Sequence, residues 1–215
     1  MIATNITDQH DDGRLQPRDD DAVLAWGTVL ERLSTGLQAW LAVVSPDGTP
    51  IVRPVLAVLV DDHLHLASSP RSRKASALEA GATATLATRA DGLDLVWAGT
   101  PVRVTDADGL DRIAATYRRR HGWDVVRDGD ALDAPYGAPC AGSPPYHAYR
   151  VEPQTVHAFG TVEGLAERST RFDHTRTPPR GRTDRAHAVV PAPREQVYAA
   201  LLDRDALAAW LPRRA

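Results

Sequence analysis

The chain of 215 residues carries a net charge of −3 at pH 7 and contains 43% hydrophobic and 25% charged residues. This balance is typical of a soluble globular protein, and it provides no basic field to attract nucleic acid or a membrane surface. No apolar run approaches the roughly 20 residues that a membrane-spanning helix needs. The single cysteine, Cys140, cannot form an internal disulfide. We therefore expect a cytoplasmic protein with neither nucleic-acid nor membrane partners.

The N-terminal part of the sequence divides into a tail and a helix. Residues 1–21 are polar and acid-rich, lack the apolar stretch of a signal peptide and hold too little to bury in a core. They are predicted to be a disordered tail. From residue 22 onward, apolar residues recur at helical spacing until Gly36, which favours termination of a helix.

A series of short strands follows. Two apolar runs flank residues 46–48, Pro-Asp-Gly, which is a hairpin pattern because glycine supplies a positive φ. A third strand is expected over residues 61–68, and two more on either side of Asp91 and Gly92. Closely spaced short strands of this kind favour a small β-barrel.

The second half of the barrel region contains one helix and a further pair of strands. A helix is predicted after Asp106, which is suited to the N-cap position. Residues 146–160 are predicted to form two strands broken at Pro153. Because strands and helices do not alternate, a doubly wound parallel sheet is not expected. The fold class predicted is mainly β with flanking helices.

The C-terminal part changes in composition. Residues 174–185 contain Pro, Gly, Arg and Thr but no apolar residue, and are predicted to be a linker. Residues 186–215 suggest a short strand, a proline turn and an amphipathic helix. Thirty residues are too few to bury an independent core.

The segment that follows the third strand combines cations with hydroxyl groups. Its members are Ser68, Ser69, Ser72, Arg71, Arg73 and Lys74. A phosphate site needs cations and short hydrogen-bond donors. The alternative is a surface helix that is capped by Ser69, has Pro70 at its first position and leaves its cations in solvent. Composition alone leaves both interpretations open.

Arg53 lies inside an apolar strand, where a cation needs a partner or an exit to water. If the strand over residues 61–68 pairs antiparallel with that strand, Arg53 and the Ser-Arg-Lys segment lie at the same end of the barrel. His63 and His65 alternate on the strand and share one face. We interpret that face as exposed and predict no metal site.

Three stretches, WLAVVSPDGTPIVRPV, LHLASSPRSRKASALEAGATATLAT and LVWAGTPVRVTD, together resemble the pyridoxamine 5′-phosphate oxidase-like superfamily. The resemblance covers about residues 23–173 and is strongest to the short branch that binds flavin or deazaflavin. It implies a six-stranded split β-barrel of Greek-key topology over residues 22–173. It also implies a homodimer with cofactor sites at the subunit interface.

The same resemblance assigns cofactor-binding roles. It places Arg53, Ser68, Ser69, Ser72, Arg73 and Lys74 around the cofactor phosphate. It places Val55 and Leu56 against the ring system. Trp97 falls on a strand near the ring, where its indole either stacks on the ring or fills the barrel.

The function implied is that of an FMN-dependent oxidoreductase acting on a small organic substrate, with the ring supplying the chemistry and no catalytic side chain named. A deazaflavin-dependent reductase and a non-catalytic flavin- or haem-binding module remain alternatives. Residues 186–215 resemble the opening of the polyketide cyclase and heat-shock ATPase activator-like lipid-binding superfamily. Because this segment is truncated, we expect it to bind no ligand.

Overall fold

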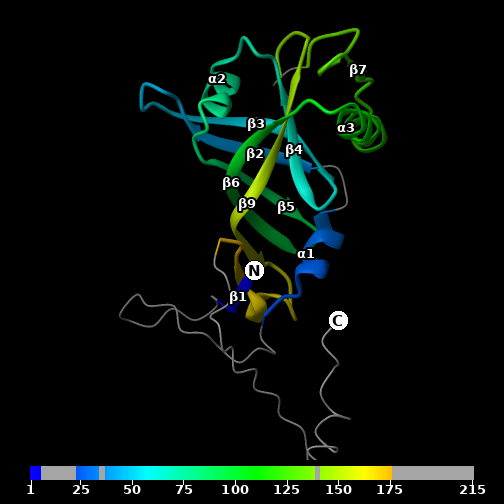
Figure 1. Cartoon of the computed structure of the whole chain (residues 1–215). Helices are drawn as coiled ribbons and strands as arrows, with labels where there is room; N and C mark the ends of the chain where they lie inside the picture. The colour runs from blue at the N-terminus through cyan, green and yellow to red at the C-terminus, as the bar shows by residue number, and fades with distance from the viewer. Residues whose placement is uncertain (6–22, 34–36, 139–140, 176–215) are drawn as a thin grey trace, which may run out of the picture. The chain divides into compact units, whose positions relative to one another are not determined.

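The computed structural model describes residues 1–5, 23–33, 37–138 and 141–175 (Figure 1). These residues belong to the first of two compact units, Met1–Pro178. The strands are β1 (Ile2–Asn5), β2 (Leu37–Val44), β3 (Pro50–Val60), β4 (His63–Ser68), β5 (Ala84–Ala90), β6 (Leu93–Val104), β7 (Val126–Asp128), β8 (Ala131–Asp133), β9 (His147–Gly160) and β10 (Thr170–Asp173). The helices are α1 (Trp26–Leu33), α2 (Arg73–Glu79), α3 (Ala107–His121) and the short η2 (Ala166–Arg168).

Six antiparallel strands close into a barrel in the order β9-β4-β3-β2-β5-β6, with β6 pairing back onto β9. The remaining length of β9 pairs with β10, and β10 pairs with β1. Alternation along the strands separates two faces, as in β6, where every second residue from Leu93 to Gly99 is buried. The predicted mainly β fold with a six-stranded split barrel is confirmed.

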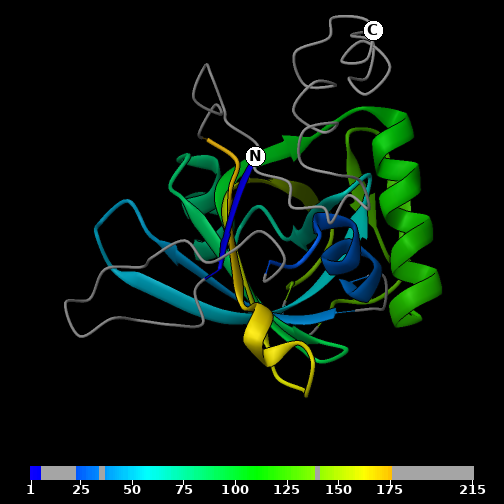
Figure 2. The same ribbon diagram turned by 90° about the horizontal axis from the view of Figure 1, so that it is seen from below.

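Two apolar clusters build the core. One fills the barrel and includes residues of α1 and α2, which lie at different ends of it in Figure 1. The other lies outside the barrel, between its wall and α3. Figure 2, seen along the barrel, shows α1 in the barrel mouth and α3 running along the outer wall. The barrel interior is therefore filled by apolar side chains, with α1 at one mouth.

The predicted N-cap of α3 is confirmed. The Asp106 carboxylate accepts from the Gly109 backbone N–H at 2.7 Å, and Gly122 ends the helix in the left-handed conformation with φ of 63°. The hairpin over residues 46–48 is also confirmed: β2 pairs with β3, and Gly48 has φ of 82°.

The predicted break at Pro153 is wrong, because β9 runs unbroken through it. The register with β6 shifts between Ala98 and Gly99, so that Gly99 pairs with Pro153 and Ala98 with Thr155. A bulge leaves one residue outside the ladder, and this is a position where a proline without an N–H is tolerated. A Cβ on Gly99 would lie 1.9 Å from the Glu152 carbonyl oxygen, so the bulge also requires this glycine.

The predicted disordered tail needs a correction at its start, because Ile2–Asn5 form β1 on the β10 edge. The sequence suggested no partner for these residues, since β10 lies about 165 residues away along the chain. Residues 6–21 of that tail lie outside the described residues, as do residue 22 and residues 176–215. At the start of the predicted linker, the His174 backbone N–H donates to the Gln154 carbonyl at 2.9 Å.

Candidate functional site

An apolar pocket of about 280 Å³ lies against the outer surface of β2 and β3. It is lined by Gln38, Ala39, Trp40, Pro54, Val55, Leu56, Ala67, Tyr117, Trp123, Ala138 and Ala141. None of these side chains is charged at neutral pH. The volume is just below the range of ligand sites, which run from roughly 300 to 1,000 Å³. The pocket therefore suits a small, uncharged group.

The floor of the pocket includes the part of β3 that pairs with β2 on one side and has no strand on its β4 side. β4 pairs with β3 only from Ala57 to Val60, so among the described strands none covers the β4-side edge at residues 54–56. The predicted ring contacts Val55 and Leu56 both line the pocket here. An uncovered strand edge offers backbone groups that can hydrogen-bond a ligand.

The far wall of the pocket comes from α3 and the turn after it. The Tyr117 hydroxyl donates to the Leu56 carbonyl at 3.2 Å, which fastens α3 to β3. Burial raises the pKa of Tyr117, so its hydroxyl stays protonated at neutral pH. Trp123 packs edge-to-face on Tyr117 and on Tyr146, with ring centroids 5.0 Å apart in both pairs. These contacts make the wall rigid.

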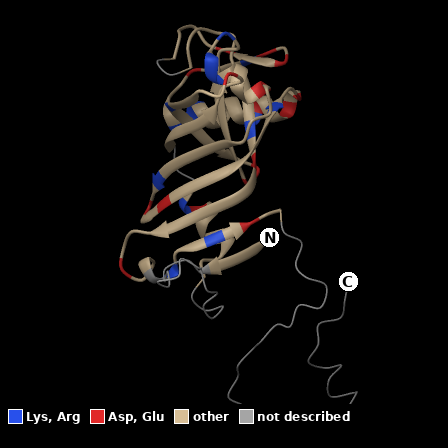
Figure 3. Ribbon diagram, turned by 90° about the vertical axis from the view of Figure 1, so that its left-hand side faces the viewer, with Lys and Arg blue, Asp and Glu red and all other residues tan. Residues whose placement is uncertain are grey.

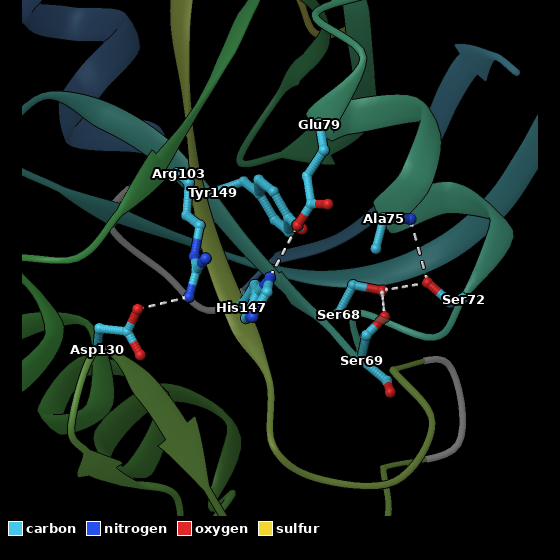
Figure 4. Close-up of polar contacts among 9 residues, drawn as sticks. All are labelled: Ser68, Ser69, Ser72, Ala75, Glu79, Arg103, Asp130, His147 and Tyr149. Atoms are coloured by element: carbon cyan, nitrogen blue, oxygen red, sulfur yellow. Dashed lines mark hydrogen bonds and ion pairs between the residues drawn. The ribbon is translucent and has the colours of Figure 1, made fainter. Parts of the chain in front are cut away.

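The predicted hydroxyl cluster begins at Ser68, directly after Ala67, which is the β4 residue in the pocket lining (Figure 4). The Ser68 and Ser72 hydroxyls are 2.8 Å apart, and Ser72 Oγ accepts from the Ala75 backbone N–H at 3.1 Å. Ser72 is thus the N-cap of α2, and the expected capping by Ser69 is wrong. The Ser69 backbone N–H instead donates to the Ala141 carbonyl at 2.8 Å, which ties this turn to the pocket wall.

The two serines at the end of β4 are enclosed. Ser68 is 0% exposed and Ser69 is 4% exposed, whereas Ser72 is partly accessible. The bonds of Ser68 go to Ser72 and to the Ser69 carbonyl. In this structure Ser68 supports the N-cap residue from within.

The cations predicted near a phosphate do not all lie together. The antiparallel register, with Ala57 opposite Leu66, puts Arg53 and the residues after Ser68 at the same end of β3 and β4. Arg53 is exposed next to pocket-lining Pro54, and Lys74 is buried in the first turn of α2.

Arg73 turns toward the β2–β3 turn. Its guanidinium lies 3.6 Å from Asp47, and both side chains are mostly exposed. The Ser45 hydroxyl, which donates to the Asp47 carboxylate, and the Thr49 N–H lower the pKa of Asp47 to about 2. This pair borders a surface hollow that is separate from the apolar pocket. Arg73 therefore lies away from the place expected for a phosphate contact.

Trp97 belongs to the barrel core. It is 0% exposed, and its indole N–H donates to the Val151 carbonyl at 2.9 Å. Its ring lies 5.5 Å from that of Trp26 on α1. Of the two alternatives left open by the sequence, the structure shows the second: the indole fills the barrel interior and does not line the apolar pocket.

A second polar cluster lies beside the hydroxyl cluster in Figure 4 and was not predicted. Glu79, the last residue of α2, accepts from His147 Nδ1 at 2.8 Å and from the Tyr149 hydroxyl at 2.9 Å. His147 is the cross-strand partner of Ser68. Nearby, Arg103 pairs with Asp130 at 2.9 Å. The contact between Glu79 and His147 spans 68 residues, so no local pattern indicated it.

His63 and His65 share one strand face, as expected, and border a hollow of about 130 Å³ near the start of α3. The predicted exposure of this face is wrong at His65, which is only 4% exposed, and His63 is only partly exposed. No cluster of three metal-ligating side chains occurs in the part of the chain that the structure describes. No helix in that part is long and apolar enough to cross a membrane.

Comparison with protein-family models gives no match, and no curated protein matches the chain. Solved structures do match. A conserved hypothetical protein from Mycobacterium tuberculosis is 15% identical with a TM-score of 0.50, over 68% of this chain and 91% of that one. A heme binding protein from Mycobacterium smegmatis is 14% identical with a TM-score of 0.50, over 70% of this chain and 58% of that one.

A pyridoxamine 5′-phosphate oxidase-related, FMN binding protein from Nostoc punctiforme is 18% identical with a TM-score of 0.43, over 64% of this chain and 86% of that one. Identities this low bear on the fold alone. The closed barrel β9-β4-β3-β2-β5-β6 and the two structures with a TM-score of 0.50 together identify this chain as a split β-barrel protein.

Proposed function

We propose that this chain is an FMN-dependent oxidoreductase of the pyridoxamine 5′-phosphate oxidase-like type, acting on a small organic substrate. The observation that carries the proposal is the apolar pocket over the free edge of β3, which ends where the Ser68–Lys74 segment begins. A flat uncharged ring fits the pocket. A phosphate tethered to that ring would lie toward the end of the barrel where Arg53 lies on β3 and Lys74 lies in the first turn of α2.

The lining residues fit a role in binding rather than in proton transfer. The only side chains there with polar atoms are Gln38, Tyr117, Trp40 and Trp123, and Tyr117 keeps its proton. When bound, the isoalloxazine supplies the redox chemistry. The protein holds the ring against residues 54–56, excludes water with the aromatic wall and neutralises the phosphate.

Two phosphate contacts carry most of this proposal. Arg53 and Lys74 provide the charges, and Ser72, with its N-cap hydroxyl at the turn, is the accessible short donor. Ser68 and Ser69 are buried and hold that turn in place through their hydrogen bonds to Ser72 and Ala141. Arg73 lies at the edge of the turn, beside Asp47. A charge-assisted hydrogen bond to phosphate contributes about 1.5–3 kcal/mol.

A deazaflavin-dependent reductase is the alternative that the pocket supports equally, because both cofactors combine a flat ring with a phosphate. A haem-binding module has less support. Haem iron is held by His, Cys, Met or Tyr. The pocket lining contains no His, Cys or Met among the described residues, and the Tyr117 hydroxyl is committed to Leu56.

We also propose that the protein is a cytoplasmic homodimer. The outer face of β2 and β3 exposes large apolar side chains: Trp40 is 57% exposed, Val44 48% and Val52 50%. Figure 3 shows few charged residues along the middle of the strands on the side it displays. Large apolar side chains exposed on neighbouring strands favour association. Because Trp40 also lines the pocket, a second copy docked here would complete the site.

The absorption spectrum of the purified protein, followed by fluorescence titration with FMN and with the deazaflavin coenzyme, tests the proposal. We expect a yellow protein, or quenching of flavin fluorescence at micromolar concentration. Binding of the deazaflavin alone would replace FMN by that cofactor. A colourless protein that binds neither would overturn the proposal.

A further inference from the structure

Gln38 brings an accessible amide group to the apolar pocket. The residue is exposed and belongs to the pocket lining. Its backbone carbonyl accepts from the Thr88 hydroxyl at 2.8 Å, whereas its side-chain amide has no hydrogen-bond partner among the residues that the structure describes. An amide carries a carbonyl acceptor beside two N–H donors. The pocket lining therefore includes a neutral group that can both donate and accept.

The face on which the Gln38 side chain lies follows from the strand. Its neighbours Leu37 and Ala39 pack into the barrel core, so Gln38 leaves β2 on the outer face. Its cross-strand partner Leu56 contacts the outer apolar cluster and lines the pocket from that same face. Because the Gln38 side chain is exposed and flexible, its amide can turn toward a group that is bound over Leu56.

The other polar side chains of the lining are less available. Tyr117 is 0% exposed, and its hydroxyl donates to the Leu56 carbonyl. The Trp123 Nε1 atom is buried, so it presents no N–H at the pocket surface. Trp40 is exposed but has only a donor, its indole N–H. Among the described residues that line the pocket, Gln38 is therefore the one whose side chain offers an accessible acceptor.

Gln38 also marks the end of the pocket that lies away from Arg53. Trp40 is opposite Pro54, the residue after Arg53, whereas Gln38 is opposite Leu56. The three steps of strand from Arg53 to Leu56 span about 10 Å. A ligand whose phosphate lies near Arg53 would therefore bring the far edge of its ring to Gln38.

We propose that Gln38 is a specificity-determining residue of the cofactor site: its side-chain amide hydrogen-bonds to an edge of the bound ring where a carbonyl group and an N–H lie side by side. This inference rests on the proposed function. The imide edge of a flavin or a deazaflavin has this arrangement, whereas a porphyrin or a hydrocarbon ring does not. An amide matches both groups of such an edge, and a ligand without them leaves the amide unpaired.

The test compares FMN with its N3-methyl derivative, in which a methyl group replaces the imide N–H and blocks the approach of the amide. Fluorescence titration of the wild type and of Gln38→Leu gives four affinities, and circular dichroism gives the melting temperatures without ligand. We expect Gln38→Leu to bind FMN about fivefold more weakly, because leucine cannot form the hydrogen bonds. Its loss for the methylated ligand should stay below about twofold. Gln154→Leu, which removes an amide bonded to Thr100, is the control and should leave the affinities unchanged.

An unchanged affinity of Gln38→Leu for FMN would overturn this inference and leave the proposed function standing. Equal losses for the two ligands would also overturn it, because the amide would then not contact the imide edge. If the wild type binds the deazaflavin coenzyme instead of FMN, the same comparison applies to that coenzyme and its N3-methyl derivative. A wild type that binds neither cofactor would overturn the proposed function, and this inference with it.

Discussion

His147 Nδ1 lies 2.8 Å from the Oε1 atom of Glu79 and so joins the first residue of β9 to the last residue of α2. The Tyr149 hydroxyl donates to the same carboxylate oxygen. Both hydrogen bonds favour the ionised carboxylate. They lower the pKa of Glu79, with the bond from His147 as the largest cause, against an opposing effect of burial.

We predict that Glu79→Gln destabilises the protein only where the carboxylate is ionised. A carboxyl whose pKa is lower in the folded state stabilises the fold above its unfolded pKa, near 4.5, and this is lost as the pH falls through the folded value. Because 44% of the Glu79 side chain is exposed, solvent reduces the effect, and we expect about 1 kcal/mol at pH 7. Urea denaturation at pH 7 and pH 3.5 measures it. Glu163→Gln is the control, and an equal deficit at both pH values would contradict the prediction.

His65 is predicted to make stability depend on pH in the mildly acidic range. Burial lowers its pKa from 6.5 to about 4, with Arg150 and His63 adding to the effect while Asp61 and the bond to the His63 carbonyl oppose it. Between these values the unfolded chain binds the proton more readily, so stability falls as the pH is lowered from 6.5 to 4, by up to about 3 kcal/mol.

The variant His65→Gln should flatten this part of the stability profile, because glutamine does not titrate. Chemical denaturation at several pH values between 4 and 7 provides the measurement. His63→Gln, on the same strand face, serves as the control and should keep the slope. Parallel profiles for wild type and His65→Gln would argue against the assignment.

A charge on the outer face of β3 should dissociate the proposed dimer. Val52 is 50% exposed on that face, and Val52→Glu would force a carboxylate into an apolar contact. We expect a monomer by size-exclusion chromatography with light scattering. Val126, also 50% exposed but on β7, provides the control Val126→Glu, which should remain a dimer. A wild-type monomer at micromolar concentration would refute this arrangement.

The proposed phosphate contact of Arg53 separates FMN from riboflavin, which shares the ring but lacks the phosphate. Arg53→Ala should weaken FMN binding about tenfold, because an exposed charged contact lies near the lower end of its usual range, and leave riboflavin binding unchanged. Fluorescence titration gives both affinities. Arg89→Ala, which removes an exposed arginine paired with Asp94, is the control. Equal losses for the two ligands would place Arg53 at the ring instead.

Features of the fold that depend on neighbouring residues could be predicted from the sequence. Asp106 caps α3 through an N–H three residues away, and Gly48 closes the β2–β3 turn, so the short-range chemistry was sufficient. The strand break predicted at Pro153 was wrong because a proline usually ends a strand, whereas here the bulge opposite Gly99 accommodates it. That bulge depends on a strand about 50 residues away, which the local sequence does not reveal.

The candidate site could be predicted only in part, for a related reason. Val55 and Leu56, which the family resemblance assigned to ring contacts, both line the pocket, and they lie on one strand with a recognisable pattern. The start of α2 was misplaced because Ser69 is held by the distant Ala141, leaving Ser72 to cap the helix. Trp123 completes the pocket through packing on Tyr146, and its spacing along the chain carries no hint of this.

Helix α2 has only seven residues, too few for a helix to persist by itself in water. Its start is held by Ser68 of β4 and its end by His147 of β9. The contact of Ser68 with Ser72 is local, whereas His147 is 68 residues from Glu79 along the chain, so the second anchor exists only after β9 has paired with β4. During folding, this end of the barrel therefore becomes ordered late, and amide hydrogens of residues 75–80 should exchange with solvent sooner than those of β5 and β6.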